Sequence, residues 1–109
     1  MKMHIMPIRR NLKFHVPDEK VLNWHSWGPT VTQFFNTLSL FFPEGERFFI
    51  NSVRKYRDRI DDPELQEAVR AFIGQEAMHG REHEDYNQKM VEAGLPVDTQ
   101  EAIVSKLLD

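Results

Sequence analysis

Residues 72–87 read FIGQEAMHGREHEDYN and contain Glu76, His79 and His83 at helical spacing. An α-helix turns about 100° per residue, so His79 lies about 60° and His83 about 20° from Glu76 around the axis. The carboxylate and the two imidazoles are therefore predicted to share one helix face. Whether this face meets water or a core decides which chemistry it supports.

The same face extends over a long helix predicted for residues 62–93. Asp62 is a typical N-cap and Pro63 a typical first helical residue, while Gly94 and Pro96 end the pattern. Steps of four and three residues alternate along the face, which is the spacing of a helix seam. The members of this seam are Leu65, Val69, Phe72, Glu76, His79, His83, Tyr86 and Met90.

A preceding helix is predicted for residues 29–60, with Pro29 in its first turn. Glu46 occupies a position that the pattern otherwise assigns to an apolar core side chain. Pro43 lies inside the helix and predicts a kink or a division into two helices. The apolar members of this second seam are Val31, Phe35, Leu38, Phe42, Phe49, Val53, Tyr56 and Ile60.

The two ends of the chain are shorter or irregular. A short last helix is predicted for residues 98–108, where Asp98 and Glu101 resemble a capping box. Residues 1–28 lack helical periodicity and are predicted to form an extended N-terminal arm.

The two long helices are joined near Asp61 and are predicted to form an antiparallel hairpin. Glu46 lies fifteen residues before Asp61, and Glu76 lies fifteen residues after it. At about 1.5 Å per residue, both carboxylates lie roughly 22 Å from the turn. We therefore expect Glu46, Glu76 and His79 to come together in the core of the hairpin.

This arrangement favours a metal site. A buried carboxylate is costly unless it is paired or bound to a metal, and two neighbouring carboxylates cost more. Carboxylates and imidazoles together suit iron, with manganese or zinc as alternatives. The candidate metal ligands are Glu46, Glu76, His79 and His83. Two other interpretations are a hydrogen-bonded polar cluster without metal and a rotated seam that lies in water.

A Glu on one helix and Glu-x-x-His on the next make up half of a carboxylate-bridged di-metal site. The other half would come from a second copy of the chain across a twofold axis, or from further chain in a longer protein. His83 exceeds this minimal pattern. It could be a metal ligand, a residue that hydrogen-bonds to a metal ligand without contacting the metal, or a proton shuttle.

Residues 79–83 also match His-x-x-Glu-His, the inverted zinc-peptidase motif, in which Glu82 would be the general base. That interpretation needs a third ligand further along the chain and leaves Glu46 and Glu76 unexplained. Together, the two motifs make Glu46, Glu76 and Glu82 the candidate catalytic residues.

Composition limits the class of protein. A chain of 109 residues, 40% hydrophobic and 28% charged, suits one small soluble domain. Its net charge of −3 gives no reason to expect a nucleic-acid partner, and the lack of cysteine excludes thiolate metal sites and cysteine nucleophiles. No apolar run approaches the roughly 20 residues of a membrane span, and the N-terminus lacks the apolar region of a secretory signal. We expect a cytoplasmic protein without a membrane partner.

The predicted fold is all-α. It consists of one domain over residues 1–109, a long helical hairpin that forms half of a ferritin-like bundle, with the arm and the short last helix attached. A hairpin alone would expose its apolar seam, so we expect the bundle to be completed by dimerisation or higher self-association.

Residues 42–49, FPEGERFF, and residues 75–83, QEAMHGREH, resemble a bacterial family labelled metal-dependent hydrolases. Arg9, Arg10, Phe14 and residues 24–29 are also similar to its N-terminal region, so that the resemblance covers most of the chain and corresponds to the N-terminal half of the family. The family in turn resembles the ferritin-like di-metal proteins.

The resemblance implies metal ligation by Glu46, Glu76 and His79, with His83 as a further ligand. It also implies a metal-dependent hydrolase, in which a metal polarises the substrate and activates water while a carboxylate takes the proton. A di-iron oxidase or ferroxidase is the alternative that a carboxylate/histidine site supports. A non-catalytic helical association module is the third hypothesis. The substrate stays open.

Overall fold

A computed structural model of the protein describes residues 6–109. One 3-10 helix, η1 (Asp18–Lys20), is followed by three α-helices: α1 (Pro29–Arg57), α2 (Pro63–Glu92) and α3 (Val97–Leu108). No strand occurs within residues 6–109, which confirms the all-α prediction. The predicted arm is extended from residue 6 to η1, and its first five residues lie outside the described residues.

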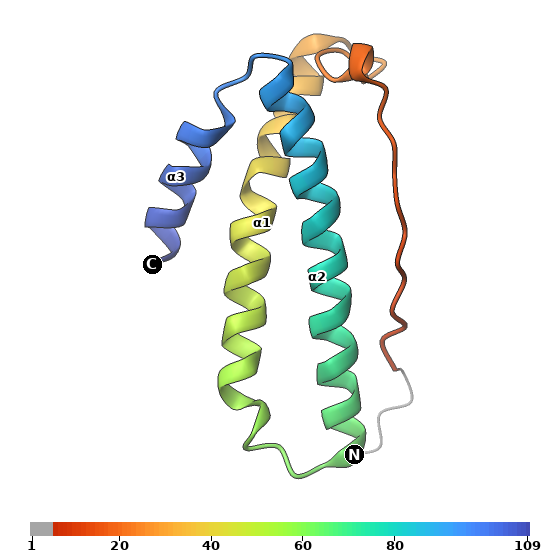
Figure 1. The fold of residues 1–109 in the computed structure, drawn as a ribbon, viewed down its shortest axis with the longest axis vertical. Helices are drawn as coiled ribbons and strands as arrows, with labels where there is room; N and C mark the ends of the chain where they lie inside the picture. The colour runs from red at the N-terminus through yellow and green to blue at the C-terminus, as the bar shows by residue number, and fades with distance from the viewer. Residues whose placement is uncertain (1–5) are drawn as a thin grey trace.

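Helices α1 and α2 lie side by side as an antiparallel hairpin, with α3 beside α1 and the arm beside α2 (Figure 1). The described chain measures 48 × 29 × 20 Å. Asp62 caps α2 as predicted, because its carboxylate accepts hydrogen bonds from the backbone N–H groups of Glu64 and Leu65. Pro43 lies within α1, which is not divided there. None of the described helices is long and apolar enough to cross a membrane.

The start of the last helix differs from the prediction. Helix α3 begins at Val97, its N-cap position is taken by Pro96, and no side chain caps it. Asp98 therefore lies in the first turn and is not the N-cap. The physical reason is packing, since Val97 is buried in a core cluster with Val21, Leu40 and Met90.

The seam predicted for α1 is correct at Glu46, which is buried, but wrong for most of its apolar members, which are exposed. Phe35, Phe42 and Phe49 are exposed by 40% or more of their surface, so other residues fill most of the space between the helices. The buried residues of α1 are Thr32, Asn36, Ser39, Leu40, Pro43 and Glu46. Small and polar side chains let the two helices approach closely and bond to each other, whereas phenyl rings would hold them apart.

The phenyl rings instead form an exposed surface along α1, which we call the aromatic face. An exposed apolar surface of this extent is typical of a protein–protein contact. Its members are Phe34, Phe35, Leu38, Phe41, Phe42, Phe48, Phe49 and Tyr56.

The arm is attached to α2 by polar side chains of the helix. The backbone N–H of Arg10 donates to Gln75 Oε1 over 2.6 Å, and that of Phe14 donates to Glu82 Oε2 over 3.1 Å. Arg81 donates to the carbonyl of Leu12 over 3.0 Å. These bonds satisfy backbone groups of an extended segment that makes no sheet.

Candidate metal centre

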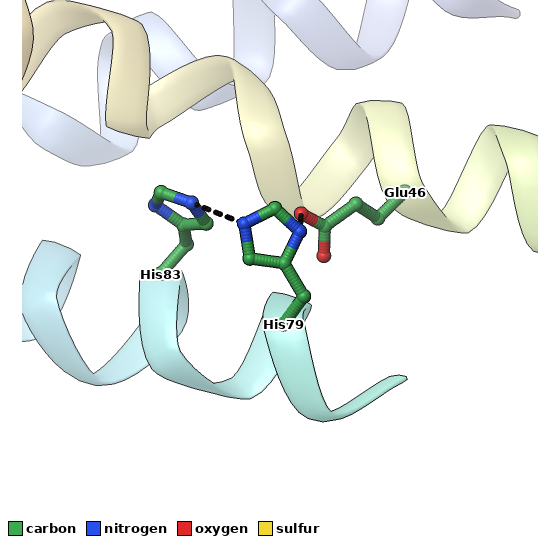
Figure 2. Close-up of side chains that lie close together, drawn as sticks. All are labelled: Glu46, His79 and His83. Carbon is green, nitrogen blue, oxygen red and sulfur yellow. Dashed lines mark hydrogen bonds and ion pairs between the residues drawn. The ribbon is translucent and has the colours of Figure 1, made fainter. Parts of the chain in front are cut away.

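Glu46 from α1 meets His79 and His83 from α2 near the middle of the hairpin. Nδ1 of His79 lies 2.8 Å from Oε1 of Glu46. Nε2 of His79 lies 3.0 Å from Nε2 of His83. Figure 2 shows the three side chains in a row, with the His79 ring between the other two. One potential ligand atom from each residue lies within 4.8 Å of the others.

The carboxylate of Glu46 is buried without hydrogen-bond donors. The residue is 3% exposed. Neither of its oxygens receives a hydrogen bond, because the contact with His79 is close but lacks hydrogen-bond geometry. A buried carboxylate left in this condition is costly, and a cation would satisfy it.

The charge state of Glu46 reflects this environment. Burial raises its pKa to about 7, the negative charges of Glu76 and Glu84 add to the effect, and Arg47 opposes it. Arg47 is engaged elsewhere, since it pairs with Glu84 over 2.8 Å and also with Glu44. Without a dedicated cationic side chain, the Glu46 carboxyl group keeps its proton more readily than usual, and a bound cation would favour its ionised form.

Gly80 makes room for this carboxylate. A Cβ atom added to Gly80 would lie 2.7 Å from Oε2 of Glu46, which is closer than such atoms approach in real structures. The absent side chain lets the carboxylate rest directly against the backbone of α2. A glycine in the interior of a helix costs about 1 kcal/mol relative to alanine, so its presence here has a structural reason.

A chain of hydrogen bonds fixes the orientation of the His83 ring. The amide of Asn87 donates to the Ser39 carbonyl over 3.2 Å and to Glu101 over 3.3 Å. Its oxygen therefore accepts from the Ser39 hydroxyl, 2.7 Å away. The Ser39 oxygen then accepts from Nδ1 of His83 over 2.8 Å. This places the proton of a neutral His83 on Nδ1 and leaves the lone pair of Nε2 facing His79.

The imidazole of His83 is held in the neutral form. Burial lowers the pKa of His83, and the adjacent His79 lowers it further, against a small opposing effect of Glu82. Phe42 stacks on the His83 ring with centroids 4.5 Å apart. A neutral, oriented imidazole is the form of histidine that binds metals.

These residues fit a divalent metal. Bonds from zinc to histidine nitrogen or carboxylate oxygen are about 2.1 Å long, so ligand atoms of one ion lie about 3 to 4 Å apart. The contacts of 2.8 and 3.0 Å use different nitrogens of His79, and an ion would bind only one of them. With one ligand atom taken from each residue, the three atoms lie within 4.8 Å of one another, so a modest movement of the side chains would bring them into this range. The His79 side chain is 46% exposed, which leaves an open side for a small molecule.

Glu76 is not part of the compact group of ligand atoms. It lines a separate cavity of about 180 Å³ together with Glu46 and Gly80. Its charge is near enough to raise the pKa of Glu46. The distance along each helix from the turn therefore predicts correctly that Glu46 lies near His79. Glu76 lies beside this group, and its role as a metal ligand stays a prediction.

Glu82 lies between the two histidines in sequence but bonds to other groups. Its carboxylate accepts from the backbone N–H of Phe14 and from Arg81, which lowers its pKa. A carboxylate in this state is a weaker base, and it holds the arm in place. Its predicted role as general base stays a prediction.

The sequence interpretation missed Ser39 and Asn87. The sequence does contain a pattern that indicates a buried position for Ser39. The small and polar residues of α1 recur in steps of four and three residues, as the phenyl rings do. These residues are Thr32, Asn36, Ser39, Pro43 and Glu46. Hydrophobicity alone favours the row of phenyl rings over the neighbouring row of small and polar residues, although the second row is the one that packs against α2.

The fold and site define a helical hairpin protein with a candidate Glu/His/His metal centre. Residues 8–109 match the family described as "Predicted metal-dependent hydrolase". The chain therefore belongs to this family, which confirms the resemblance seen in its motifs. A search of curated proteins found no match. A search of solved structures also found none.

Proposed function

We propose that the protein is a hydrolase whose metal ion is held by Glu46, His79 and His83. The observation that carries this proposal is the Glu46 carboxylate, buried beside two imidazoles without a hydrogen-bond donor. Family membership supports the same class of reaction. A hydrogen-bonded polar cluster without metal is less consistent with the two unsatisfied oxygens.

A divalent metal at such a site would polarise a carbonyl group and make water a better nucleophile near neutral pH. In the reaction, the hydroxyl of water joins the acyl carbon, the ester or amide bond breaks, and the leaving group takes the remaining proton. We assign the transfer of that proton to Glu76, because it lines the cavity next to Glu46 and is free of the bonds that occupy Glu82.

One carboxylate and two imidazoles suit iron, zinc and manganese, and iron is the ion we propose. Iron would also serve the alternative function, oxidation with O₂. That alternative needs a second carboxylate-rich half, since di-iron sites of this type use two Glu-x-x-His helices.

We further propose that two copies of the chain associate through the aromatic face. Pairing two hairpins would produce a four-helix arrangement of the ferritin-like kind and bury the exposed phenyl rings. The face is next to the metal centre, because Phe42 belongs to it and also stacks on His83. Association would therefore enclose the open side of the site.

The test is hydrolysis by protein reconstituted separately with iron, zinc and manganese. We expect turnover of p-nitrophenyl esters with at least one metal, and loss of that turnover in His79→Ala. His15→Ala is the matched control, because it removes an exposed histidine of the arm. Consumption of O₂ by the iron form without ester turnover would instead favour the oxidase.

A further inference from the structure

A cavity of about 470 Å³ lies between the arm, α1 and α2. His79 and His83 line one part of its wall, and Leu12, Phe14 and Val16 of the arm line another. This volume lies in the usual range for small-molecule sites. The cavity therefore has the size and the position of a substrate site for the metal centre.

The arm contributes an apolar wall by simple alternation. Successive side chains of an extended segment point to opposite sides, so Leu12, Phe14 and Val16 all point to the same side. Leu12 is still 52% exposed and Phe14 73% exposed. A ligand in the cavity would cover apolar surface that now contacts water, which favours binding.

Two of the charged groups of the lining are already neutralised by partners within the protein. Lys89 pairs with Asp18 over 2.7 Å. Glu82 is bonded to the arm and to Arg81. A third charged group of the lining is the exposed carboxylate of Asp85. An anionic ligand would meet this carboxylate and would have to displace Asp18 to reach Lys89, so the lining disfavours an anion.

Polar atoms away from the histidines are likewise satisfied by one another. The indole N–H of Trp24 lies 3.0 Å from both Asn36 Oδ1 and the Tyr86 hydroxyl, and Tyr86 donates to the same Asn36 oxygen. The aromatic rings of Trp24 and Tyr86 are then left as the surfaces that line this part of the cavity. Polar recognition is therefore left to the two histidines and the Asp85 carboxylate.

We propose that this cavity binds the hydrocarbon part of a neutral ester or amide, with its carbonyl group at His79 and His83. The proposal rests on the proposed function for the choice of ester or amide, but the binding of a neutral, apolar chain can be tested without turnover. The arm is then a wall of the substrate site.

The test uses 2-decanone, a neutral ketone with no bond to hydrolyse, and the decanoate anion, each titrated calorimetrically into the metal-free full chain, so that the carboxylate has no cation to bind. We expect saturable binding of 2-decanone and about tenfold weaker binding of decanoate, because the anion enters an apolar cavity. Phe14→Asp should weaken 2-decanone binding about tenfold, since it removes apolar contact and adds charge. Ile8→Asp is the matched control, because Ile8 is an arm residue, 67% exposed, outside the cavity lining.

Equal binding of 2-decanone by Phe14→Asp and the unmodified protein would overturn the proposal, as would decanoate binding as tightly as the ketone. If Phe14→Asp does not fold, NMR shifts of the His79 and His83 rings on adding 2-decanone to the unmodified protein decide the question, because unchanged shifts contradict the proposed placement. Ketone binding as expected, together with no ester turnover in any metal form, would support the cavity and contradict the hydrolase.

Discussion

The Ser39 hydroxyl of α1 lies 2.8 Å from Nδ1 of His83 on α2, and it connects that histidine to Asn87 and through it to Glu101 on α3. All three helices thus determine which nitrogen of His83 is free. The whole fold therefore sets the orientation of this candidate ligand, because Ser39, which bonds to it, is buried and is itself hydrogen-bonded to Asn87.

We predict that Ser39→Ala lowers metal affinity about 10- to 100-fold, because the ring of His83 loses the acceptor that fixes its proton on Nδ1. Competition with a chromophoric chelator measures the affinity, and ¹⁵N shifts of His83 report the tautomer. Ser52→Ala is the matched control, since Ser52 also lies on α1 but bonds to the Phe48 carbonyl. An unchanged affinity with an unchanged tautomer would show that Ser39 does not orient the ligand.

We predict that Gly80→Ala separates metal binding from stability. The new Cβ would lie 2.7 Å from Glu46 Oε2, so the carboxylate must move and metal affinity should fall. Alanine is at the same time favoured in a helix by up to about 1 kcal/mol, so the free energy of unfolding of the metal-free protein should change little.

Gly45→Ala is the matched control for Gly80→Ala, because a Cβ at Gly45 meets no atom within 4 Å. It should stabilise α1 by about 0.5–1 kcal/mol and leave metal affinity unchanged. Chelator competition and urea unfolding give both quantities. Equal metal affinities for the two variants would argue against a ligand role for Glu46.

We predict that the metal-free protein loses stability as pH rises. The pKa of Glu46 is raised from 4.5 to about 7 in the folded chain, so the folded state holds this proton more tightly than the unfolded state. Its contribution is fully present below pH 4.5, falls between 4.5 and about 7, and is lost above that. The difference corresponds to roughly 3 kcal/mol.

Urea unfolding between pH 5 and 8 measures this effect, with Glu46→Gln as the comparison. The variant should lack this contribution, because its amide does not titrate. His83, whose pKa is lowered by burial, contributes with the opposite sign in both proteins, so the difference between the two profiles isolates Glu46. Parallel profiles would mean that Glu46 titrates normally in the folded chain.

We predict that Phe48→Glu converts an oligomer to a monomer of 12.9 kDa. Phe48 is 47% exposed within the aromatic face, and a charge at a buried contact between copies is costly. Sedimentation equilibrium gives the mass. Leu107→Glu is the control, because Leu107 is 76% exposed on α3, outside the aromatic face. A monomeric unmodified protein would contradict the proposed association.

Periodicity, caps and the turn position predicted the hairpin and the meeting of Glu46 with His79, because these depend on local geometry. Which side of α1 faces α2 was not predictable in the same way. Both the phenyl seam and the polar seam have helical spacing, and the choice between them depends on how closely the two helices pack. Ser39 and Asn87 became recognisable only through contacts between helices far apart in sequence.

The most direct test of the metal centre is the metal content per chain of the purified protein and three variants, at known oligomeric mass. We expect bound iron, zinc or manganese in the unmodified protein and its loss in Glu46→Ala and His79→Ala. Glu67→Ala, which removes an exposed carboxylate of α2, should retain the metal. Equal metal content in all four proteins, or none in the unmodified protein after growth with each metal, would contradict a metal centre at Glu46 and His79.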